Sequence, residues 1–570
     1  MDQLFAAVAG GNQVYLAVFI GFLRWVSPVL ALLILLRCGL PLLTFRREPE
    51  IWAWLCMDGG KKFAITHWEN IIGRSPQCDV VVDFPTVSRN HAVLTRYDDG
   101  SWTVSDADSK SGLSVNEQRG KIFALGEGDV ICVGGVDLVF RPITPRQEQR
   151  LAQIRTRAAS FGTSLVNLFL LSLFQCLVCM GYLVSGRGST GVVIGFGGIL
   201  VVQWALLIFY GIIDRPAFGV ETIAFFLCTM GMAAVTAVKP DEAVKQVVSI
   251  VMGVGLFLTV GWSLRDLELA KKIRYIAAIA GIGFLLITLI FGREINGAKN
   301  WLIIGSFSVQ LSELSKICFI FVGASTMDKL LDKRNLYQFI GYSVAVCGFL
   351  ALMNDFGTAL IFFMAFLVIA YLRSGSVGTV ALACTSLGFA GVVALRIAPH
   401  ALRRFASWRH IWEVPLAGGY QQTRALMCMA SGGLLGLGPG QGWMKNVFAA
   451  DSDMVFATIS EEWGLLMAML LISAVVMLAV FTVRSAVVGR SSFYTIGACT
   501  AGGILLTQAI LNALGTVDVV PLTGVTFPFV SNGGSSMIGM WGLLAFIKAA
   551  DTRQNGSFAV RLTGGADIDE

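Results

Sequence analysis

Residues 451–484 read DSDMVFATISEEWGLLMAMLLISAVVMLAVFTVR, passing from a small acidic run directly into a long apolar segment. The apolar part, from about residue 462 to 484, is long enough to cross a bilayer as a helix. An unpaired carboxylate at such a boundary costs free energy, which marks Asp453 as a candidate functional residue. The alternative is that Asp453 only caps the helix that follows it.

The rest of the chain is similarly apolar. Of its 570 residues, 55% are hydrophobic and only 14% are charged, and the mean hydropathy is +0.70. No soluble surface could hide so much apolar area from water, so the sequence predicts a polytopic α-helical membrane protein. We expect about thirteen spans, near residues 14–36, 161–184, 189–213, 219–238, 242–263, 273–292, 311–328, 336–353, 356–372, 376–395, 462–484, 492–514 and 533–550.

Residues 50–142 differ in kind, because they are polar and contain short alternating strands. Turn signals at Asp99-Gly100 and Gly134-Gly135 predict two hairpins, and the whole segment predicts a small soluble β-sandwich. A basic linker then leads back into lipid, with Arg146, Arg150, Arg155 and Arg157.

Basic residues between the spans predict the orientation of the chain. Arg37, Arg46 and Arg47 follow the first span, whereas the residues before it carry no Lys or Arg. The positive-inside rule therefore places the N-terminus outside and the sandwich in the cytoplasm, and short basic loops such as RDLELAKKIR (265–274) and the C-terminal tail agree. Residues 396–461 then lie outside, and this long, glycine-rich segment is where function is expected.

Three polar motifs in the sandwich suit phosphate binding. They are Gly73-Arg74-Ser75, the run SRNHA at 88–92, and SKSG at 109–112. Guanidinium forks and hydroxyl groups satisfy phosphate oxygens at short range. The segment closely resembles a forkhead-associated (FHA) domain, whose loops at one end of the sandwich bind phosphothreonine.

The FHA resemblance implies a role for each of these residues. Arg74 and Ser88 would contact the phosphate, Arg89 and Ser109 would support them, and His91 would be structural. Ser111 would also belong to the phosphothreonine site, at a position where the family usually has Asn. The alternative is a scaffold that has lost phosphopeptide binding.

Four polar clusters interrupt the membrane part. They are GAKNWLIIGSFSVQLSELSK (297–316), NDFGT (354–358), the loop GGYQQTRALMCMASGGLLGLGPGQG (418–442) that leads to Asp453 and Glu461-Glu462, and PLTGVTFPFVSNGGSS (521–536). Glu313 and Lys316 are three residues apart and so share a helix face, where they can pair their charges. The glycines from 436 to 442 superficially suggest a nucleotide loop, but no strand-turn-helix unit surrounds them.

Together these clusters resemble the SEDS family of cell-wall polymerases, which includes FtsW, RodA and SpoVE, over roughly residues 216–550. The clusters occur in the family's order and topology. The chain departs from the family pattern at Leu311, Asn354 and Asn532 and around Asp453, but the carboxylates remain. The expected division is an N-terminal anchor (1–45), a cytoplasmic FHA domain (46–145), a basic linker with two helices (146–215), a ten-helix SEDS-type core (216–552) and a cytoplasmic tail (553–570), so that about three spans precede the core.

The resemblance implies a peptidoglycan glycosyltransferase that polymerises lipid II at the outer face of the cytoplasmic membrane, with Asp453 essential. Inversion at the donor sugar needs a base for the acceptor 4-hydroxyl, and desolvation would raise the pKa of Asp453 and improve it as that base. Asp355, Glu313 and Lys316 are expected to shape the cavity. Substrate binding is expected from Lys299, Arg404, Gln421, Glu462, Ser531 and Gly533, with Arg403 and Arg409 as further cations. Each of these four basic residues could instead be an ordinary interfacial anchor.

The expected partners follow from the same resemblance. No transpeptidase domain is present, so a class B penicillin-binding protein is implied, together with a phosphothreonine protein or Ser/Thr kinase at the FHA domain. A divalent cation such as Mg or Mn could assist at the pyrophosphate, and no nucleic acid is expected. The rival functions are a lipid II flippase and a phosphosignal receptor whose membrane part is inert.

Overall fold

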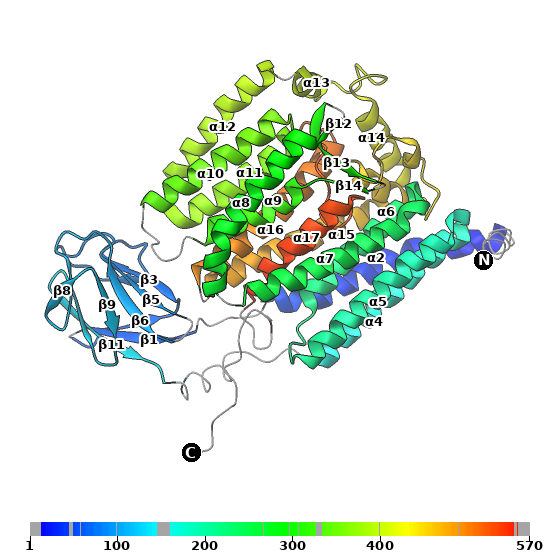
Figure 1. Ribbon diagram of the computed structural model, residues 1–570. Coiled ribbons are helices and arrows are strands. Elements are labelled where there is room, and N and C mark those ends of the chain that lie inside the picture. The colour runs from blue at the N-terminus through cyan, green and yellow to red at the C-terminus, as the bar shows by residue number, and fades with distance from the viewer. Residues whose placement is uncertain are drawn as a thin grey trace.

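The computed structural model describes residues 13–44, 50–57, 59–97, 100–144, 147, 160–265, 267–295, 297–305, 307–325, 333–397, 399–489, 491–551 and 556. A β-sandwich lies against one end of a larger helical bundle (Figure 1). Several of the basic residues between the predicted spans lie outside the described residues. They are Arg46, Arg47 and the four arginines of the basic linker, and the tail from residue 557 also lies outside.

The sandwich consists of two sheets with strand orders β2-β1-β11-β10-β7-β8 and β4-β3-β5-β6-β9. Alternating burial along the strands packs their inner faces into one apolar core that includes Leu55, Ile72 and Phe140. The strands are β1 (Ala53–Met57), β2 (Lys62–Ile65), β3 (Glu69–Gly73), β4 (Val80–Val81), β5 (Ala92–Arg96), β6 (Trp102–Asp106), β7 (Leu113–Val115), β8 (Gln118–Gly120), β9 (Ile122–Leu125), β10 (Val130–Val133) and β11 (Val136–Pro142).

The predicted hairpin at Gly134-Gly135 is confirmed. Val133 pairs with Val136, and both intervening glycines have positive φ, as a two-residue hairpin turn requires. Strands β5 and β6 also pair as an antiparallel hairpin, although Asp99 in its turn lies outside the described residues.

The bundle contains the predicted membrane helices. Nine helices in the described part of the chain are long and apolar enough to span a membrane, and three shorter apolar helices accompany them. The helices are α2 (Gln13–Thr44), α4 (Phe161–Tyr182), α5 (Thr190–Ile212), α6 (Gly219–Val238), α7 (Ala243–Ser263), α8 (Leu267–Phe291), α9 (Ser312–Ala324), α10 (Lys333–Leu352), α11 (Phe356–Ser374), α12 (Val377–Ile397), α13 (Pro399–Ser407), α14 (Tyr420–Gly432), α15 (Val455–Val487), α16 (Ser492–Thr516) and α17 (Gly534–Ala549).

The centre of the bundle is α6, whose membrane-crossing window is completely buried. Helices α2, α4 and α5 pack on it, with α4 and α5 joined to α6 by a buried network of Gln175, Gln203 and Thr229. Amide and hydroxyl groups inside a membrane need such partners, because lipid offers none. The three helices that precede α6 are thus an integral layer of the bundle.

A small antiparallel sheet, which the sequence did not predict, lies between α8 and α9. It comprises β12 (Arg293–Ile295), β13 (Ala298–Ile304) and β14 (Phe307–Val309). The β-branched pair Ile303-Ile304 favours a strand, and the backbone N–H of Lys299 donates to Met353 O at 2.9 Å, which ties the sheet to the end of α10. The predicted span at 311–328 is correspondingly short, because α9 ends at Ala324.

The predicted pairing of Glu313 with Lys316 on one face of α9 is present. Their Oε2 and Nζ atoms are 2.7 Å apart, and both side chains are buried.

We expect Lys316→Met to lower the free energy of unfolding by about 3–5 kcal/mol, because it leaves a buried carboxylate without its countercharge. Chemical denaturation of the purified protein measures this loss. The double variant that adds Glu313→Gln should recover most of it, and equal stability of wild type and single variant would contradict the prediction.

The sandwich contacts the bundle at the turn between α15 and α16. The buried Glu69 carboxylate, at the start of β3, accepts hydrogen bonds from Ser491 Oγ (3.0 Å) and from Ser492 N and Oγ (3.0 and 3.1 Å). His67 Nδ1 lies 2.8 Å from Gly489 O. A carboxylate beside the first N–H groups of a helix satisfies donors that have no partner within that helix. The sandwich therefore completes the N-terminus of α16.

Candidate functional site

Three polar segments meet at the end of the bundle away from the sandwich. They are α13, the loop 447–454 before α15, and residues 521–533 before α17. Helix α15 begins beside Asp453 at this end, and its other end leads to Gly489, which contacts the sandwich. The bundle thus separates Asp453 from the FHA-like part by the length of a membrane-spanning helix.

Asp453 is held through its backbone by α16. Asn512 Nδ2 donates to Asp453 O at 3.0 Å and to Val525 O at 2.8 Å, so one amide joins the loop before α15 to the segment before α17. Ser531 Oγ adds a second link by donating to Ser452 O at 2.7 Å. Asn512 and Ser531 bind the backbone carbonyls of residues 453 and 452, so neither of them occupies the Asp453 carboxylate.

The Asp453 carboxylate lies beside Gly524 and Arg404. A Cβ placed on Gly524 would be 3.4 Å from Asp453 Oδ2 and 3.8 Å from Arg404 Nη1, and the φ of +70° at this position favours glycine. Arg404 Nη1 also donates to Leu522 O at 3.3 Å, which fixes α13 over the loop. Because Gly524 has no side chain, its loop can lie close to both the Asp453 carboxylate and the Arg404 guanidinium.

Burial raises the pKa of Asp453, while the Arg404 charge opposes that rise and the Asp451 charge adds to it. The side chain is nevertheless partly exposed, so it is both desolvated and reachable. The residue at the N-cap of α15 is Met454, and no side-chain capping bond is present. The helix-capping alternative for Asp453 is therefore wrong.

Asp451 has a different environment from Asp453. Its buried carboxylate is 3.1 Å from the half-exposed Lys239 Nζ, and Asn532 Nδ2 donates to the same oxygen at 2.7 Å. Asn532 also donates to Glu242 Oε2 at 2.7 Å. Sequence reasoning missed Lys239, because its neighbours in the chain form an ordinary helix end. Its role follows only from the contact with a loop more than two hundred residues away.

The remaining predicted binding residues are distributed around this centre. Gln421 Nε2 donates to Phe448 O at 2.9 Å, which secures the loop before Asp453. Gly533 immediately precedes α17, next to Ser536. Lys299 lies on β13 with its Nζ 3.5 Å from Ile290 O, and the side chain of Arg403 lies outside the described residues. The structure therefore joins Arg404 and Ser531 to the Asp453 centre directly, and Gln421 through its loop.

Glu462 has a setting different from that expected of a substrate ligand. It is buried, and its two carboxylate oxygens accept from Tyr182 Oη at 2.7 Å and from Gly442 N at 3.4 Å. Glu461 similarly accepts from the backbone N–H groups of Trp443 and Met444 at 2.9 and 2.8 Å. Both glutamates thus hold the glycine-rich loop against the first turns of α15. We therefore assign Glu462 a supporting position instead of substrate binding.

Asp355 joins two elements at the same end of the bundle. Its Oδ1 accepts from Thr358 N at 3.1 Å at the start of α11, and its Oδ2 accepts from Asn300 Nδ2 at 2.9 Å and from Gln310 Nε2 at 3.3 Å. The carboxylate therefore fastens the small β12–β14 sheet to α11. Its predicted cavity-shaping role stays a prediction.

The phosphothreonine motif residues gather at one end of the sandwich. Arg74 and Arg89 are exposed, and Ser88 Oγ accepts from Lys110 N at 3.0 Å. Ser109 Oγ donates to Asp106 Oδ1 at 2.5 Å and accepts from Gly112 N at 3.0 Å, and Ser111 Oγ donates to Thr86 O at 3.3 Å.

His91 is fully buried beneath these loops. Its Nδ1 accepts from Ser88 N at 3.2 Å, so its Nε2 carries the proton and donates to Gly112 O at 3.0 Å. The ring thereby links the two loops that carry Ser88 and Ser109. The exposed arginines and the braced hydroxyls leave a polar, cationic surface above it.

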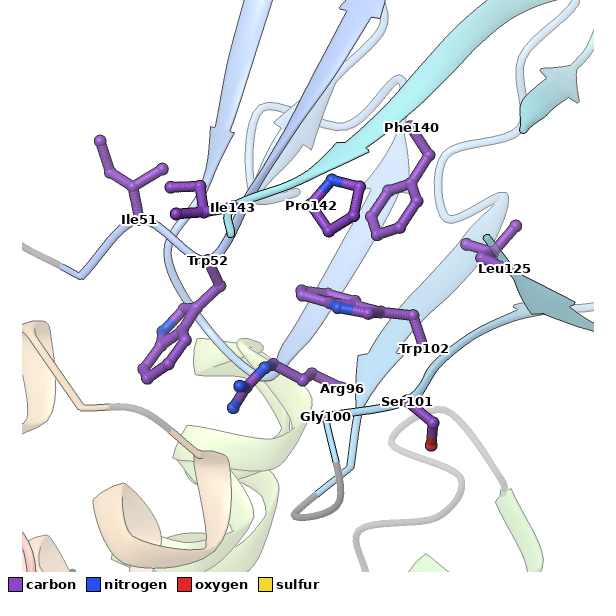
Figure 2. A pocket seen from close by; sticks show the side chains of 10 residues that line it. All are labelled: Ile51, Trp52, Arg96, Gly100, Ser101, Trp102, Leu125, Phe140, Pro142 and Ile143. Carbon is purple, nitrogen blue, oxygen red and sulfur yellow. The ribbon is translucent and has the colours of Figure 1, made fainter. Parts of the chain in front are cut away.

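A separate pocket lies at the opposite end of the sandwich, where β5 ends. It is lined by Trp52, Arg96 and Trp102, and the Arg96 guanidinium stacks 4.3 Å from the Trp52 ring centroid (Figure 2). Its lining is largely apolar and contains none of the phosphothreonine motif residues. Within the described residues, no three His, Cys, Asp or Glu side chains gather to hold a metal ion.

Comparisons with known proteins agree with both resemblances. A model of the FtsW/RodA/SpoVE family of cell cycle proteins matches residues 218–556, and an FHA domain model matches residues 70–134. Peptidoglycan glycosyltransferase RodA of Mycobacterium tuberculosis (strain ATCC 25618 / H37Rv) is 31% identical over 330 residues, covering 54% of this chain and 70% of that protein. The probable peptidoglycan glycosyltransferase FtsW of Nitrosococcus halophilus (strain Nc4) is 32% identical over 307 residues, covering 50% and 78%.

A chain solved in a study of a peptidoglycan synthase complex is 23% identical, with a TM-score of 0.48, covering 58% of this chain and 96% of that one. The family model spans more than half of the chain. The protein therefore belongs to the FtsW/RodA/SpoVE family, and it is a multi-pass membrane protein that carries an FHA domain. Helices α2, α4 and α5 precede the matched region.

Proposed function

We propose that the protein is a peptidoglycan glycosyltransferase that polymerises lipid II, with Asp453 as its general base. The observation that carries this proposal is the Asp453 environment, where a partly exposed carboxylate of raised pKa lies beside Arg404 in a frame built from three segments. The named activity of the RodA and FtsW relatives supports it. A base with a raised pKa is better matched to removing a proton near neutral pH.

The proposed reaction is an inverting displacement. The acceptor 4-hydroxyl oxygen bonds to the anomeric carbon of the donor, while the bond from that carbon to the lipid pyrophosphate oxygen breaks. The hydroxyl proton passes to Asp453, and the electron pair of the broken bond leaves with the pyrophosphate. Arg404 and Lys239 supply positive charge at this end of the bundle, which would stabilise the departing anion.

The proposed orientation places Asp453 at the outer face of the cytoplasmic membrane and the FHA domain in the cytoplasm. Asp453 and the sandwich lie at opposite ends of α15, and the basic loops predict that the sandwich end is cytoplasmic. Lipid-linked precursors would then be used outside while phosphorylated proteins bind inside.

The proposed partners follow from this division. A class B penicillin-binding transpeptidase would crosslink the glycan product. A phosphothreonine protein, such as a Ser/Thr kinase or its substrate, would bind the FHA loops and recruit or adjust synthesis.

The experiment that tests the function supplies the purified protein in lipid vesicles with labelled lipid II and separates the products on a gel. We expect a ladder of glycan polymer from the wild-type protein. Movement of lipid II across the vesicle membrane without any polymer would instead identify a flippase. A protein that binds phosphothreonine peptides but neither moves nor polymerises lipid II would be a receptor.

A further inference from the structure

Helix α4 lies before the region shared with the family. Its last residue, Tyr182, contacts Glu462, one of the two adjacent glutamates Glu461 and Glu462 on α15. Tyr182, the last residue of α4, is fully buried, and its Oη donates to Glu462 Oε2 at 2.7 Å. Trp463 Nε1 donates back to Tyr182 Oη at 3.1 Å. The phenol is therefore engaged in both directions, by a carboxylate that accepts and an indole that donates.

The glutamate pair in turn holds the loop that leads to Asp453. Glu461 and Glu462 together accept hydrogen bonds from three successive backbone N–H groups at residues 442–444. The backbone N–H groups of Leu437 and Gly438 donate to the carbonyls of the same two glutamates, both at 2.9 Å. Five backbone N–H groups of the loop thus bind the two glutamates at the start of α15.

Close packing reinforces this attachment from the α4 side. A Cβ placed on Gly181 would lie 2.8 Å from Pro439 Cγ, so the end of α4 rests on the loop without an intervening side chain. Within the loop, Met444 packs with Val447 and with Met454, the residue after Asp453, in a small apolar cluster. Contacts therefore run without a break from Tyr182 to the segment that carries the proposed base.

We infer that Tyr182 is a positioning residue for the glycosyl transfer. It would act through Glu462, which accepts from Gly442 N next to the residues that Glu461 holds, to fix the loop that presents Asp453. This inference rests on the proposed function. It gives the added helix α4 a part in the chemistry of the core, because a base must be held within a fraction of an ångström of its productive position.

The chain offers a matched control. Tyr210, on α5, is also fully buried and donates to a buried core glutamate, Glu221 Oε1, at 2.8 Å. That pair lies near the end of α5 and the start of α6, at the opposite end of the bundle from Asp453. Tyr182→Phe and Tyr210→Phe therefore remove the same kind of hydrogen bond and keep the same ring, but only Tyr182 donates to a glutamate that also accepts from the loop, at Gly442 N.

The test measures lipid II polymerisation kinetics and amide hydrogen exchange on the full-length protein in nanodiscs. For Tyr182→Phe we expect kcat to fall by about tenfold or more, with KM little changed, because a displaced base slows the chemical step. Exchange at residues 442–444 should become faster. Tyr210→Phe should leave both measurements at wild-type values.

Two results would overturn the inference. They are wild-type kcat in Tyr182→Phe, whether or not exchange at 442–444 becomes faster, and equal losses of kcat in the two variants, which would indicate a general packing effect. If the wild-type protein forms no polymer, the proposed function fails, and unchanged exchange in Tyr182→Phe would then separately show that the hydroxyl does not hold the loop.

Discussion

Asp453→Asn is expected to abolish polymer formation from lipid II, with a loss of at least about a hundredfold in kcat. Asparagine keeps the size of the side chain and the backbone contact with Asn512, but it cannot accept the proton of the acceptor hydroxyl. The polymerisation assay measures this loss. The matched control is Asp241→Asn, which changes an exposed carboxylate in the short turn between α6 and α7 at the same end of the bundle. Polymer formation by Asp453→Asn at the wild-type rate would refute the proposed role.

The pH dependence of the wild-type activity is a second test of the role of Asp453. Burial raises the pKa of Asp453, and a base acts only when it is deprotonated. Activity should therefore fall as the pH drops through this raised pKa, at a higher pH than the value of about 4 typical of aspartate.

Stability should respond in the opposite direction. A raised pKa in the folded state means that ionising Asp453 costs stability as the pH rises through that pKa. Asp453→Asn removes this cost, so its Tm at neutral pH should equal or exceed that of the wild type. Thermal unfolding thereby distinguishes a catalytic loss from misfolding.

Arg74→Ala is expected to lower phosphothreonine peptide affinity by about tenfold to a hundredfold, because a guanidinium-phosphate contact is charge-assisted and stronger than a neutral hydrogen bond. Calorimetry of the full-length protein with a phosphothreonine peptide measures the change. The exposed Arg141, on β11 and away from the motif loops, provides the control Arg141→Ala, which should bind as the wild type does.

The polymerisation assay completes this comparison. Arg74→Ala should polymerise lipid II normally when no phosphopeptide is present, since Arg74 lies at the far end of the protein from Asp453. If wild type and Arg74→Ala bind the phosphopeptide equally, the phosphothreonine site has been assigned to the wrong residues.

The sequence predicted those parts of the molecule that depend on local patterns. Apolar runs predicted the helices, and turn glycines predicted the β10–β11 hairpin. Arg404 was a candidate as an external cation and Ser531 as part of the 521–536 cluster, and the structure joins both to the Asp453 loop. The spacing of Glu313 and Lys316 sufficed to predict their ion pair, because residues three apart on a helix are neighbours.

Features that depend on distant contacts were not accessible in this way. Lys239 and Asp451 are separated by most of the core sequence, and Tyr182 and Glu462 by 280 residues. Glu462 was expected to bind substrate from the family resemblance, whereas its oxygens accept hydrogen bonds from Tyr182 and Gly442. Pairing of β13 with its neighbours was missed because its apolar residues lie next to a helix and resemble a helix end.

The hydrogen bonds from Ser491 and Ser492 to Glu69 fix the position of the FHA domain relative to α16 and so determine where a recruited protein would lie. Because a buried carboxylate fixes the domain, the domain keeps one orientation around the bundle. Gln77, in the loop that follows Arg74, lies beside Gly375 in the turn between α11 and α12. A phosphoprotein bound there would always lie next to the same side of the helical bundle. Its local concentration relative to the membrane helices would then be set by rigid geometry instead of by the reach of a flexible tether.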